Sequence, residues 1–188
     1  MAHRALFLKK FLTHGTRIAS VTPSSRWMCR ELAARVDPAT PQRILELGAG
    51  TGVVTRVIQS RMHPASTLVA FEPDPDFAAV LSRRTRARVR PEGFEALADE
   101  PPDEPFDVVV SGLPVPSFDD ATRGVLFDAV RRHAPGASYA QLTEIPMLYK
   151  PIYARVFERV RFRAVPLNLP PGGVYHCAGI RADAPGRG

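Results

Sequence analysis

Three glycines at alternating positions form the chemically most informative segment of this 188-residue chain: Gly48, Gly50 and Gly52. They follow a short apolar run, and glycine lets the backbone turn sharply and approach a ligand that any Cβ would hold away. The next apolar run ends at Glu72, which lies 20 residues beyond Gly52. A carboxylate at that distance is typical of the second strand of a βαβ unit that binds a ribose. The segment therefore predicts a nucleoside-binding crevice.

The glycine spacing indicates which nucleoside. Gly-x-Gly-x-Gly departs from Gly-x-Gly-x-x-Gly, the pattern that seats a pyrophosphate on a helix N-terminus. A nucleoside without phosphate fits better, and this favours S-adenosylmethionine (SAM) as the cofactor. We expect Glu46 to receive the ammonium of the methionyl part, and Glu72 to accept both ribose hydroxyls, because a carboxylate offers two acceptor oxygens. The predicted cofactor-binding residues here are Glu46, Gly48, Ala49, Gly50, Thr51, Gly52, Glu72 and Pro73.

The sequence leaves two interpretations open for the residues that contact adenine. Many such enzymes place an acid after the third strand, where it takes the adenine amino group, and the local sequence here is Pro91-Glu92-Gly93-Phe94-Glu95. Phe94 would stack on the ring and Glu95 would accept the amine, or else either residue belongs to the core or the surface. We include both among the candidate cofactor residues.

A second candidate segment, Ser111-Gly112-Leu113-Pro114, ends another apolar run. Pro114 restricts Leu113 to extended angles and lacks an N–H. Backbone carbonyls there would accept hydrogen bonds from an amine and aim its lone pair at the methyl group, with Ser111 also counted in the cofactor site. The alternative is a plain strand-to-helix turn. Displacement at a sulfonium needs positioning more than acid–base work, and the sequence predicts no metal site.

Strand-type and helix-type patterns alternate around these segments. The predicted strands are 43–47, 67–71, 87–90, 106–111 and 137–143, with helices over 53–62, 75–84 and 119–133. This alternation predicts a parallel sheet with ligands at the carboxyl ends of its strands.

Two further extended runs, 160–169 and 174–180, are joined only by Pro170-Pro171-Gly172-Gly173. Such a short connection joins only antiparallel strands. We therefore predict an α/β, Rossmann-like class I methyltransferase fold, with a mostly parallel seven-stranded sheet that ends in a C-terminal antiparallel hairpin.

The N-terminal segment is basic, with no acidic residue before Glu31. Residues 2–14 form an amphipathic helical pattern at about 100° per residue. The apolar core is too short for a secretory signal, and a mitochondrial transit peptide would share the Arg-rich composition. A basic helix that lies on a membrane interface or folds over the cleft fits best. In that interpretation Lys9, Lys10 and Arg17 attract anionic lipid.

A second helix is predicted to start at an N-cap, Thr22, with Pro23 at its first position, and to end near Val36. We expect three parts: N-terminal helices over 1–36, a SAM-binding domain over 37–181 and a disordered tail over 182–188. The net charge of +6 favours a polyanionic partner. No apolar run is long enough to span a bilayer. Cys29 and Cys177 lie far apart, which indicates reduced thiols in a cytosolic protein.

The chain resembles the small soluble bacterial phosphatidylethanolamine N-methyltransferases from about Phe7 to Tyr175. The motifs that carry the resemblance are Ser20–Ser25, Glu46–Gly52, Ser111–Pro114, Gln141–Thr143 and Asn168–Pro171. The resemblance implies methyl transfer from SAM to an ethanolamine headgroup by a peripheral membrane protein whose N-terminal amphipathic helix covers the active site.

Two positions depart from that family. Glu144 stands where an aromatic residue is usual, and the Asp after the third strand is absent at Phe94. Glu144 either holds a cationic amine, which makes it a candidate catalytic residue, or indicates a different acceptor.

The leading hypothesis is a SAM-dependent N-methyltransferase, cytoplasmic and peripheral on the inner face of the membrane, that methylates phosphatidylethanolamine or a related amino lipid. Its expected partners are an anionic phospholipid surface and the lipid substrate, and nucleic acid is less favoured. An rRNA adenine N-methyltransferase is an alternative, although those enzymes append a helical domain and prefer an aromatic residue where Val115 stands. A small-molecule amine methyltransferase and a catalytically silent SAM-binding module are the remaining alternatives. The oligomeric state is not indicated.

Overall fold

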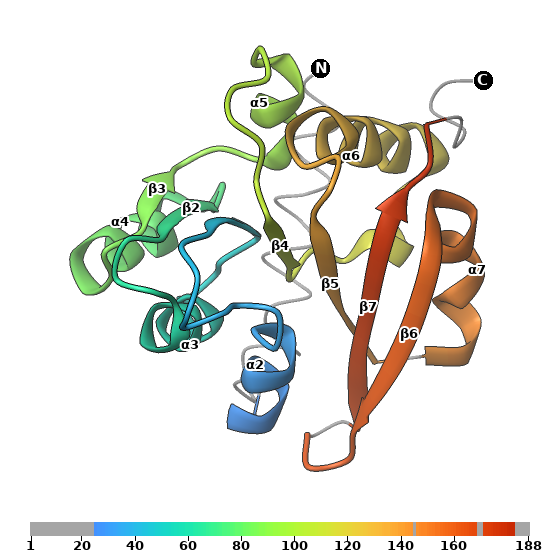
Figure 1. Ribbon diagram of the computed structural model, residues 1–188, viewed down its shortest axis with the longest axis horizontal. Helices are drawn as coiled ribbons and strands as arrows, with labels where there is room; N and C mark the ends of the chain where they lie inside the picture. The colour runs from blue at the N-terminus through green and yellow to red at the C-terminus, as the bar shows by residue number, and fades with distance from the viewer. Residues whose placement is uncertain (1–24, 145, 169–170, 183–188) are drawn as a thin grey trace.

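A seven-stranded sheet in the order β3-β2-β1-β4-β5-β7-β6 organises the computed structural model, which describes residues 25–144, 146–168 and 171–182 (Figure 1). The strands are β1 (Arg43–Leu47), β2 (Thr67–Phe71), β3 (Arg88–Arg90), β4 (Val108–Ser111), β5 (Ser138–Thr143), β6 (Phe157–Val165) and β7 (Gly172–Ile180). β1 to β5 pair in parallel, whereas β7 is antiparallel to both β5 and β6. This is the predicted Rossmann-like class I arrangement with its C-terminal hairpin.

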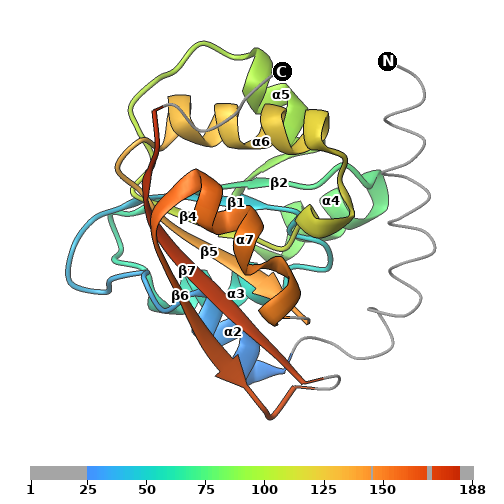
Figure 2. The same ribbon diagram turned by 90° about the vertical axis from the view of Figure 1, so that its right-hand side faces the viewer.

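Helices cover both faces of the sheet. They are α2 (Arg26–Leu32), α3 (Val53–Arg61), α4 (Pro75–Arg84), α5 (Phe94–Asp99), the 3-10 turn η1 (Val115–Ser117), α6 (Asp120–His133) and α7 (Pro146–Val156). α2 and α3 bury Met28, Leu32 and Ile58 against one face, while α5, α6 and α7 enclose a larger, aromatic core on the other. Figures 1 and 2 show these two layers with the sheet between them.

The structure corrects the predicted start of the helix before the sheet. α2 begins at Arg26, later than predicted, because Ser25 is its N-cap and the Ser25 Oγ accepts from the Met28 N–H at 3.2 Å. The Ser25 N–H in turn donates to Oδ1 of Asn168 at 2.9 Å. A contact 143 residues away in sequence therefore fixes the place where the helix begins.

The hairpin strands also differ from their predicted bounds. β6 runs from Phe157 rather than residue 160 and ends at Val165, and β7 begins at Gly172. Gly173 belongs to the strand because it pairs with Thr143 of β5 and Ala164 of β6. A Cβ there would lie 2.2 Å from the carbonyl oxygen of Arg163 and 2.5 Å from the Phe162 ring. The glycine thus serves close packing within the hairpin rather than the turn.

Two helices, α5 and α7, were not predicted. α7 contains Pro151, which lacks the N–H of a helical hydrogen bond, so the local sequence does not favour a helix there. Burial compensates, since Tyr153 and Val156 are both in the aromatic core. Long-range packing, not local propensity, forms this helix.

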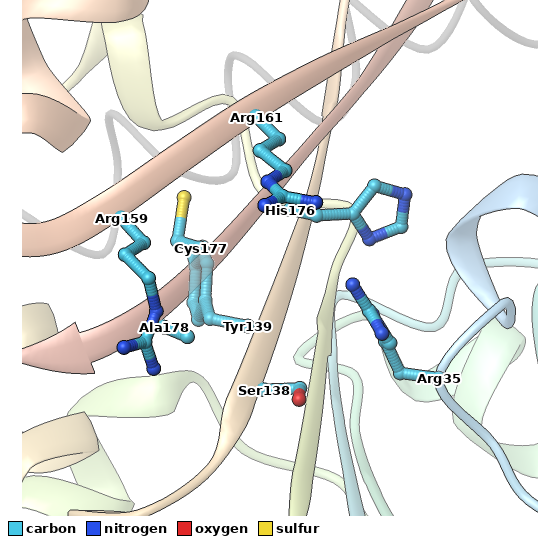
Figure 3. A pocket seen from close by; sticks show the side chains of 8 residues that line it. All are labelled: Arg35, Ser138, Tyr139, Arg159, Arg161, His176, Cys177 and Ala178. Atoms are coloured by element: carbon cyan, nitrogen blue, oxygen red, sulfur yellow. The ribbon is translucent and has the colours of Figure 1, made fainter.

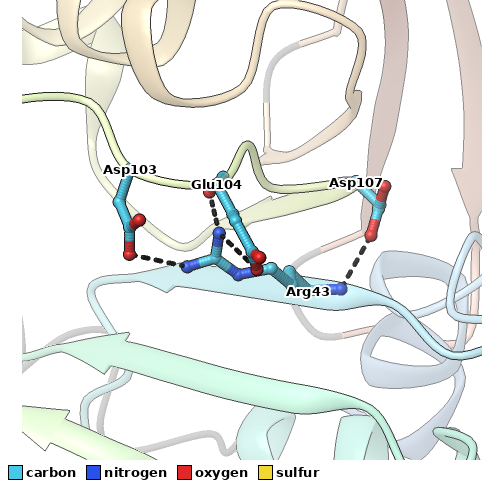
Figure 4. A network of polar contacts seen from close by, with 4 residues as sticks. All are labelled: Arg43, Asp103, Glu104 and Asp107. Carbon is cyan, nitrogen blue, oxygen red and sulfur yellow. Dashed lines mark hydrogen bonds and ion pairs between the residues drawn. The ribbon is translucent and has the colours of Figure 1, made fainter.

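An ion-pair network ties the amino end of β1 to the segment before β4 (Figure 4). The Arg43 guanidinium lies 3.6 Å from Asp103 Oδ2 and 3.5 Å from Glu104 Oε2 and also donates to the Glu104 carbonyl oxygen. The Arg43 backbone N–H donates to Asp107 Oδ2 at 2.7 Å. These contacts fix the register of β1 and β4, whose opposite ends carry the candidate site.

Several sequence predictions fall outside the described residues. They are the amphipathic helix at 2–14 with Lys9, Lys10 and Arg17, the cap at Thr22 and the tail from residue 183 onwards. Within the described part of the chain, no helix has the length and apolarity needed to cross a bilayer.

Candidate active site

The glycine loop follows β1 and is held against β2. The backbone N–H groups of Gly48 and Ala49 both donate to the carbonyl oxygen of Phe71, at 2.9 and 3.2 Å. Gly50 and Gly52 have φ of 54° and 76°, in the left-handed region that favours glycine. Gly52 then serves as the N-cap of α3.

The glycines of the loop face different surroundings. A Cβ at Gly52 would lie 2.4 Å from Leu81 Cδ1, whereas a Cβ at Gly50 would meet nothing within 4 Å. Gly52 is therefore needed for packing between α3 and α4. Gly50 borders open space, where the predicted cofactor would approach the backbone.

Glu72 holds the glycine loop in place through its side chain. Its side chain is buried, with Oε2 accepting from the Gly50 N–H at 2.6 Å and Oε1 accepting from the Asp74 N–H at 2.9 Å. Burial raises the pKa of Glu72, and the two backbone donors partly oppose that rise. Each carboxylate oxygen of Glu72 can accept one more hydrogen bond. Holding the glycine loop therefore leaves room for the predicted contact with the ribose hydroxyls, which stays a prediction.

Glu46 lies in β1, only 2% exposed. Burial raises its pKa to about 8, the nearby Thr55 hydroxyl opposes the rise, and the charge of Glu72 adds to it. Among the described residues Glu46 Oε2 has no hydrogen-bond partner. A buried acceptor without a partner is costly, and a cationic group would satisfy it. The ammonium of SAM is such a group, and its contact with Glu46 stays a prediction.

The second predicted segment, Ser111 to Pro114, lies directly beside the glycine loop. The Gly112 N–H donates to the carbonyl oxygen of Leu47 at 2.9 Å. A Cβ at Gly112 would lie 2.9 Å from the Gly48 carbonyl oxygen. Gly112 is exposed while Ser111 and Leu113 are buried. The fold thus brings together the two segments that the sequence singled out.

Gln141 holds the Leu113 carbonyl. Its Nε2 donates to the Leu113 oxygen at 2.8 Å, and its Oε1 accepts from the Tyr139 hydroxyl at 2.7 Å. The Leu113 N–H donates to Ser111 Oγ at 3.3 Å. The Leu113 carbonyl, which also accepts from the Val115 N–H at 2.9 Å, is therefore engaged within the fold, and the predicted contact of this segment with an amine stays a prediction.

Two tyrosines that sequence reasoning missed stand next to this network. Tyr153 of α7 and Tyr175 of β7 are fully buried, with ring centroids 4.9 Å apart. Tyr175 pairs with Gln141 across the strands. Both hydroxyls lack a hydrogen-bond partner among the described residues. The Gln141–Thr143 motif was a signal for this region, but the tyrosine on α7 had no predicted element to place it.

The burial of Phe94 favours the second of the two interpretations that the sequence left open for it. It is 1% exposed and packs against Phe118, with ring centroids 5.6 Å apart, so it is a core residue and not an adenine-stacking surface. Its neighbour Glu95 is half-buried on α5. Thr51 is exposed at the glycine loop, and Pro73 is half-buried after β2.

Glu144 is exposed just after β5. Its Cα would lie 3.5 Å from a Cβ placed on Gly172, so it stands beside the start of β7. The carboxylate is at the same edge of the sheet as Gly112, although the role in amine binding stays a prediction.

Comparison with known proteins agrees with this geometry. A family model described as a methyltransferase domain matches residues 44–136. The ornithine lipid N-methyltransferase of Singulisphaera acidiphila is 41% identical over 187 residues, which cover 94% of this chain and 96% of that protein.

Solved structures share the fold. The 1,6-didemethyltoxoflavin-N1-methyltransferase of Burkholderia thailandensis, with bound S-adenosylhomocysteine, superposes with a TM-score of 0.68 at 15% identity over 97% of this chain and 90% of that one. Human methyltransferase-like protein 13, also in complex with S-adenosylhomocysteine, gives 0.60 at 17% identity over 84% and 82%.

The family match and these relatives identify the chain as a SAM-dependent methyltransferase, with SAM as its cofactor. The chain belongs to the small bacterial lipid N-methyltransferases of the class I methyltransferase superfamily.

Proposed function

We propose that this protein methylates the primary amine of an amino lipid of the ornithine-lipid type, at a membrane surface. The observation that carries the proposal is the 41% identity, over almost the whole length of both chains, to an ornithine lipid N-methyltransferase. The resemblance found in the sequence suggested phosphatidylethanolamine, which also presents a primary amine. The acceptor is thus a lipid amine in both cases, and the experiment below separates the two.

The residues at the site fit this chemistry. SAM supplies a methyl group on a sulfonium, which is already activated for displacement, so the protein must position a neutral amine. Gly112 is the exposed residue of the segment beside the glycine loop. Glu144 offers an exposed carboxylate at the same edge. These groups would orient the amine before transfer.

The distribution of exposed apolar side chains favours a lipid acceptor over a soluble one. Among the described residues the large apolar side chains that are mainly exposed are Trp27, Leu148 and Leu167, which are 43%, 65% and 68% exposed. They lie at the start of α2, in the first turn of α7 and in the β6–β7 connection. Figures 1 and 2 place these three segments at the same end of the molecule.

This apolar end is adjacent to the site. Ser25 is bonded to Asn168, and a Cβ on Gly172 would lie 3.3 Å from Met28 Cε, so α2 and the hairpin are in contact. Arg26 and Arg30 lie over the Trp27 ring, at 5.0 and 5.7 Å from its centroid. Tryptophan beside arginine suits the boundary between headgroups and acyl chains. The carboxyl ends of β4 and β5 open toward this boundary in the proposed orientation.

Incubation with SAM and vesicles that contain either ornithine lipid or phosphatidylethanolamine, followed by mass spectrometry of the lipids, tests the function. We expect methylated ornithine lipid. Methylation of phosphatidylethanolamine alone would keep the amino-lipid function and replace the acceptor. Absence of any methylated lipid, with SAM binding intact, would refute the proposal.

The proposed membrane surface has its own test. The double variant Trp27→Glu, Leu167→Glu should lose vesicle binding and lipid methylation while it retains SAM affinity. A matched control is Ala121→Glu, which adds charge at an exposed position of α6. Equal vesicle binding by the double variant and the control would show that this end does not contact lipid. The predicted contribution of Lys9, Lys10 and Arg17 is tested by the same assay.

A further inference from the structure

A pocket of about 300 Å³ lies on the α2 face of the sheet, away from the glycine loop (Figure 3). It is lined by Arg35, Ser138, Tyr139, Arg159, Arg161, His176, Cys177 and Ala178. Ser138 is the first residue of β5, so the pocket reaches the amino edge of the sheet, whereas Gly50 and Gly112 are at the carboxyl edge. We call it the arginine pocket.

The strand geometry gathers its cations. Arg159 and Arg161 are two residues apart on β6 and therefore project from one face. Arg161 pairs with His176 and Arg159 pairs with Ala178 in β7. Arg35, in the segment after α2, extends toward the strands from the other side, as Figure 3 shows. Three guanidinium groups thus surround one concavity.

These cations have no counter-charge within the described residues. Arg43, Arg90, Arg123 and Arg131 each form an ion pair with a carboxylate, but Arg35, Arg159 and Arg161 form none. The nearby carboxylate of Glu31 is engaged with His176 Nε2 at 2.8 Å. The positive charge of the pocket is therefore available to a ligand.

His176 provides a second, independent indication. Its side chain is only 9% exposed, and its other ring nitrogen, Nδ1, is buried without a hydrogen-bond partner among the described residues. A buried polar atom of this kind normally has a protein or solvent partner. Because Nε2 faces the Glu31 carboxylate and carries the hydrogen, Nδ1 is the acceptor of a neutral ring, and the P–OH of a singly protonated phosphate in the pocket would donate to it.

We propose that the arginine pocket binds a phosphate-type oxyanion, a site separate from that of methyl transfer. Guanidinium groups match phosphate oxygens with paired N–H donors, and Ser138 and His176 add polar groups of the kind that complete such a site. The volume suits a phosphate or a small phosphate ester. Free phosphate and the phosphate of a lipid headgroup share this chemistry. The pocket does not depend on the proposed acceptor, because it reaches the edge of β5 opposite the apolar end.

The full chain tests the proposal with two probes, inorganic phosphate and dihexanoyl phosphatidylglycerol below its aggregation concentration. Binding is measured by calorimetry and by thermal shift, at constant ionic strength maintained with chloride. Binding of both probes assigns the site to phosphate itself, and binding of the lipid alone assigns it to a headgroup. Either result supports the pocket as an oxyanion site, and binding of neither probe overturns it.

Two variants locate the site. Arg161→Gln should weaken binding by about tenfold or more, because a hydrogen bond to a charged group contributes on that order. Arg163→Gln is the matched control, since it removes the same charge from the same face of β6 at a position outside the pocket lining. Circular dichroism and SAM affinity verify that both variants fold. An equal loss of affinity in the Arg163→Gln control would show that binding depends only on the net charge of the protein, and this result would overturn the proposal.

Discussion

The backbone N–H of Gly50 donates to Oε2 of Glu72 at 2.6 Å, so the residue that borders the cofactor space is held by a carboxylate that is only 1% exposed. The other oxygen of the same carboxylate accepts from the Asp74 N–H. Glu72 therefore connects β2 to the glycine loop after β1. Loss of the carboxylate should alter the loop as well as any ribose contact.

Glu72→Gln keeps the shape of the side chain but replaces one acceptor oxygen with an NH2 group that cannot accept either bond. We expect the affinity for SAM to fall by about tenfold or more, since bonds to a charged acceptor contribute about 1.5–3 kcal/mol. Titration calorimetry with SAM measures the effect. Glu92→Gln, at an exposed position, should bind SAM like the parent protein. An unchanged SAM affinity in Glu72→Gln would exclude the residue from the cofactor site.

Alanine at Gly50 should mainly lower the affinity for SAM, whereas alanine at Gly52 should mainly lower stability. Both positions have positive φ, so either substitution costs about 1–2 kcal/mol of stability. Gly52→Ala should cost further stability, because its Cβ would overlap buried Leu81 at 2.4 Å. Gly50→Ala has space for its Cβ and should instead lose SAM affinity. Chemical denaturation and SAM titration of both variants separate the effects, and a Gly50→Ala protein with full SAM affinity would contradict the assignment.

The elements around the cofactor were predictable because local pattern specifies them. β1, the glycine loop and β2 follow from apolar periodicity and glycine spacing, and the parallel topology placed Ser111–Pro114 beside the loop. The hairpin was predicted in type, but its bounds depended on the close approach of Gly173 to Phe162 and Arg163. Local sequence does not encode that contact.

The acceptor side was far less predictable, since its geometry depends on long-range packing. Pro151 is unfavourable inside a helix, so local sequence does not predict α7, and the position of Tyr153 on that helix was not predicted either. The burial of Phe94 depends on Phe118, which comes from a different part of the chain. The bond from Gln141 to the Leu113 carbonyl likewise joins residues 28 apart in sequence. No short motif predicts such pairs.

Gln141→Leu tests whether the Leu113 carbonyl must be held in place. The variant removes the Nε2 donor to the Leu113 oxygen, which then keeps only the Val115 N–H, and it removes the Oε1 acceptor of the Tyr139 hydroxyl. We expect kcat to fall at least about tenfold from misplacement of the segment beside the glycine loop, with SAM affinity changed less than about twofold. Tyr139→Phe removes the hydroxyl and keeps both Gln141 donors, so its kcat should fall less. Equal kcat values for Gln141→Leu and the parent would contradict this role.

Glu46 should make the stability of the SAM-free protein depend on pH. Burial raises its folded-state pKa to about 8, whereas an unfolded glutamate titrates near about 4.3. Between these values the folded chain retains a proton that the unfolded chain has released. The free energy of unfolding therefore falls as pH rises, by up to about 1.4 kcal/mol per pH unit.

Glu46→Gln removes this contribution, so its unfolding free energy should fall less steeply between about pH 5 and pH 7.5 in urea titrations. Glu72, whose pKa burial also raises, contributes with the same sign in both proteins, and the difference between them reports Glu46 together with its charge interaction with Glu72. SAM binding should have the opposite pH dependence, because the ammonium of SAM favours the ionised carboxylate. The affinity for SAM should therefore increase with pH in the parent and stay level in the variant. Parallel stability curves for the two proteins would show that Glu46 is already ionised in the folded state.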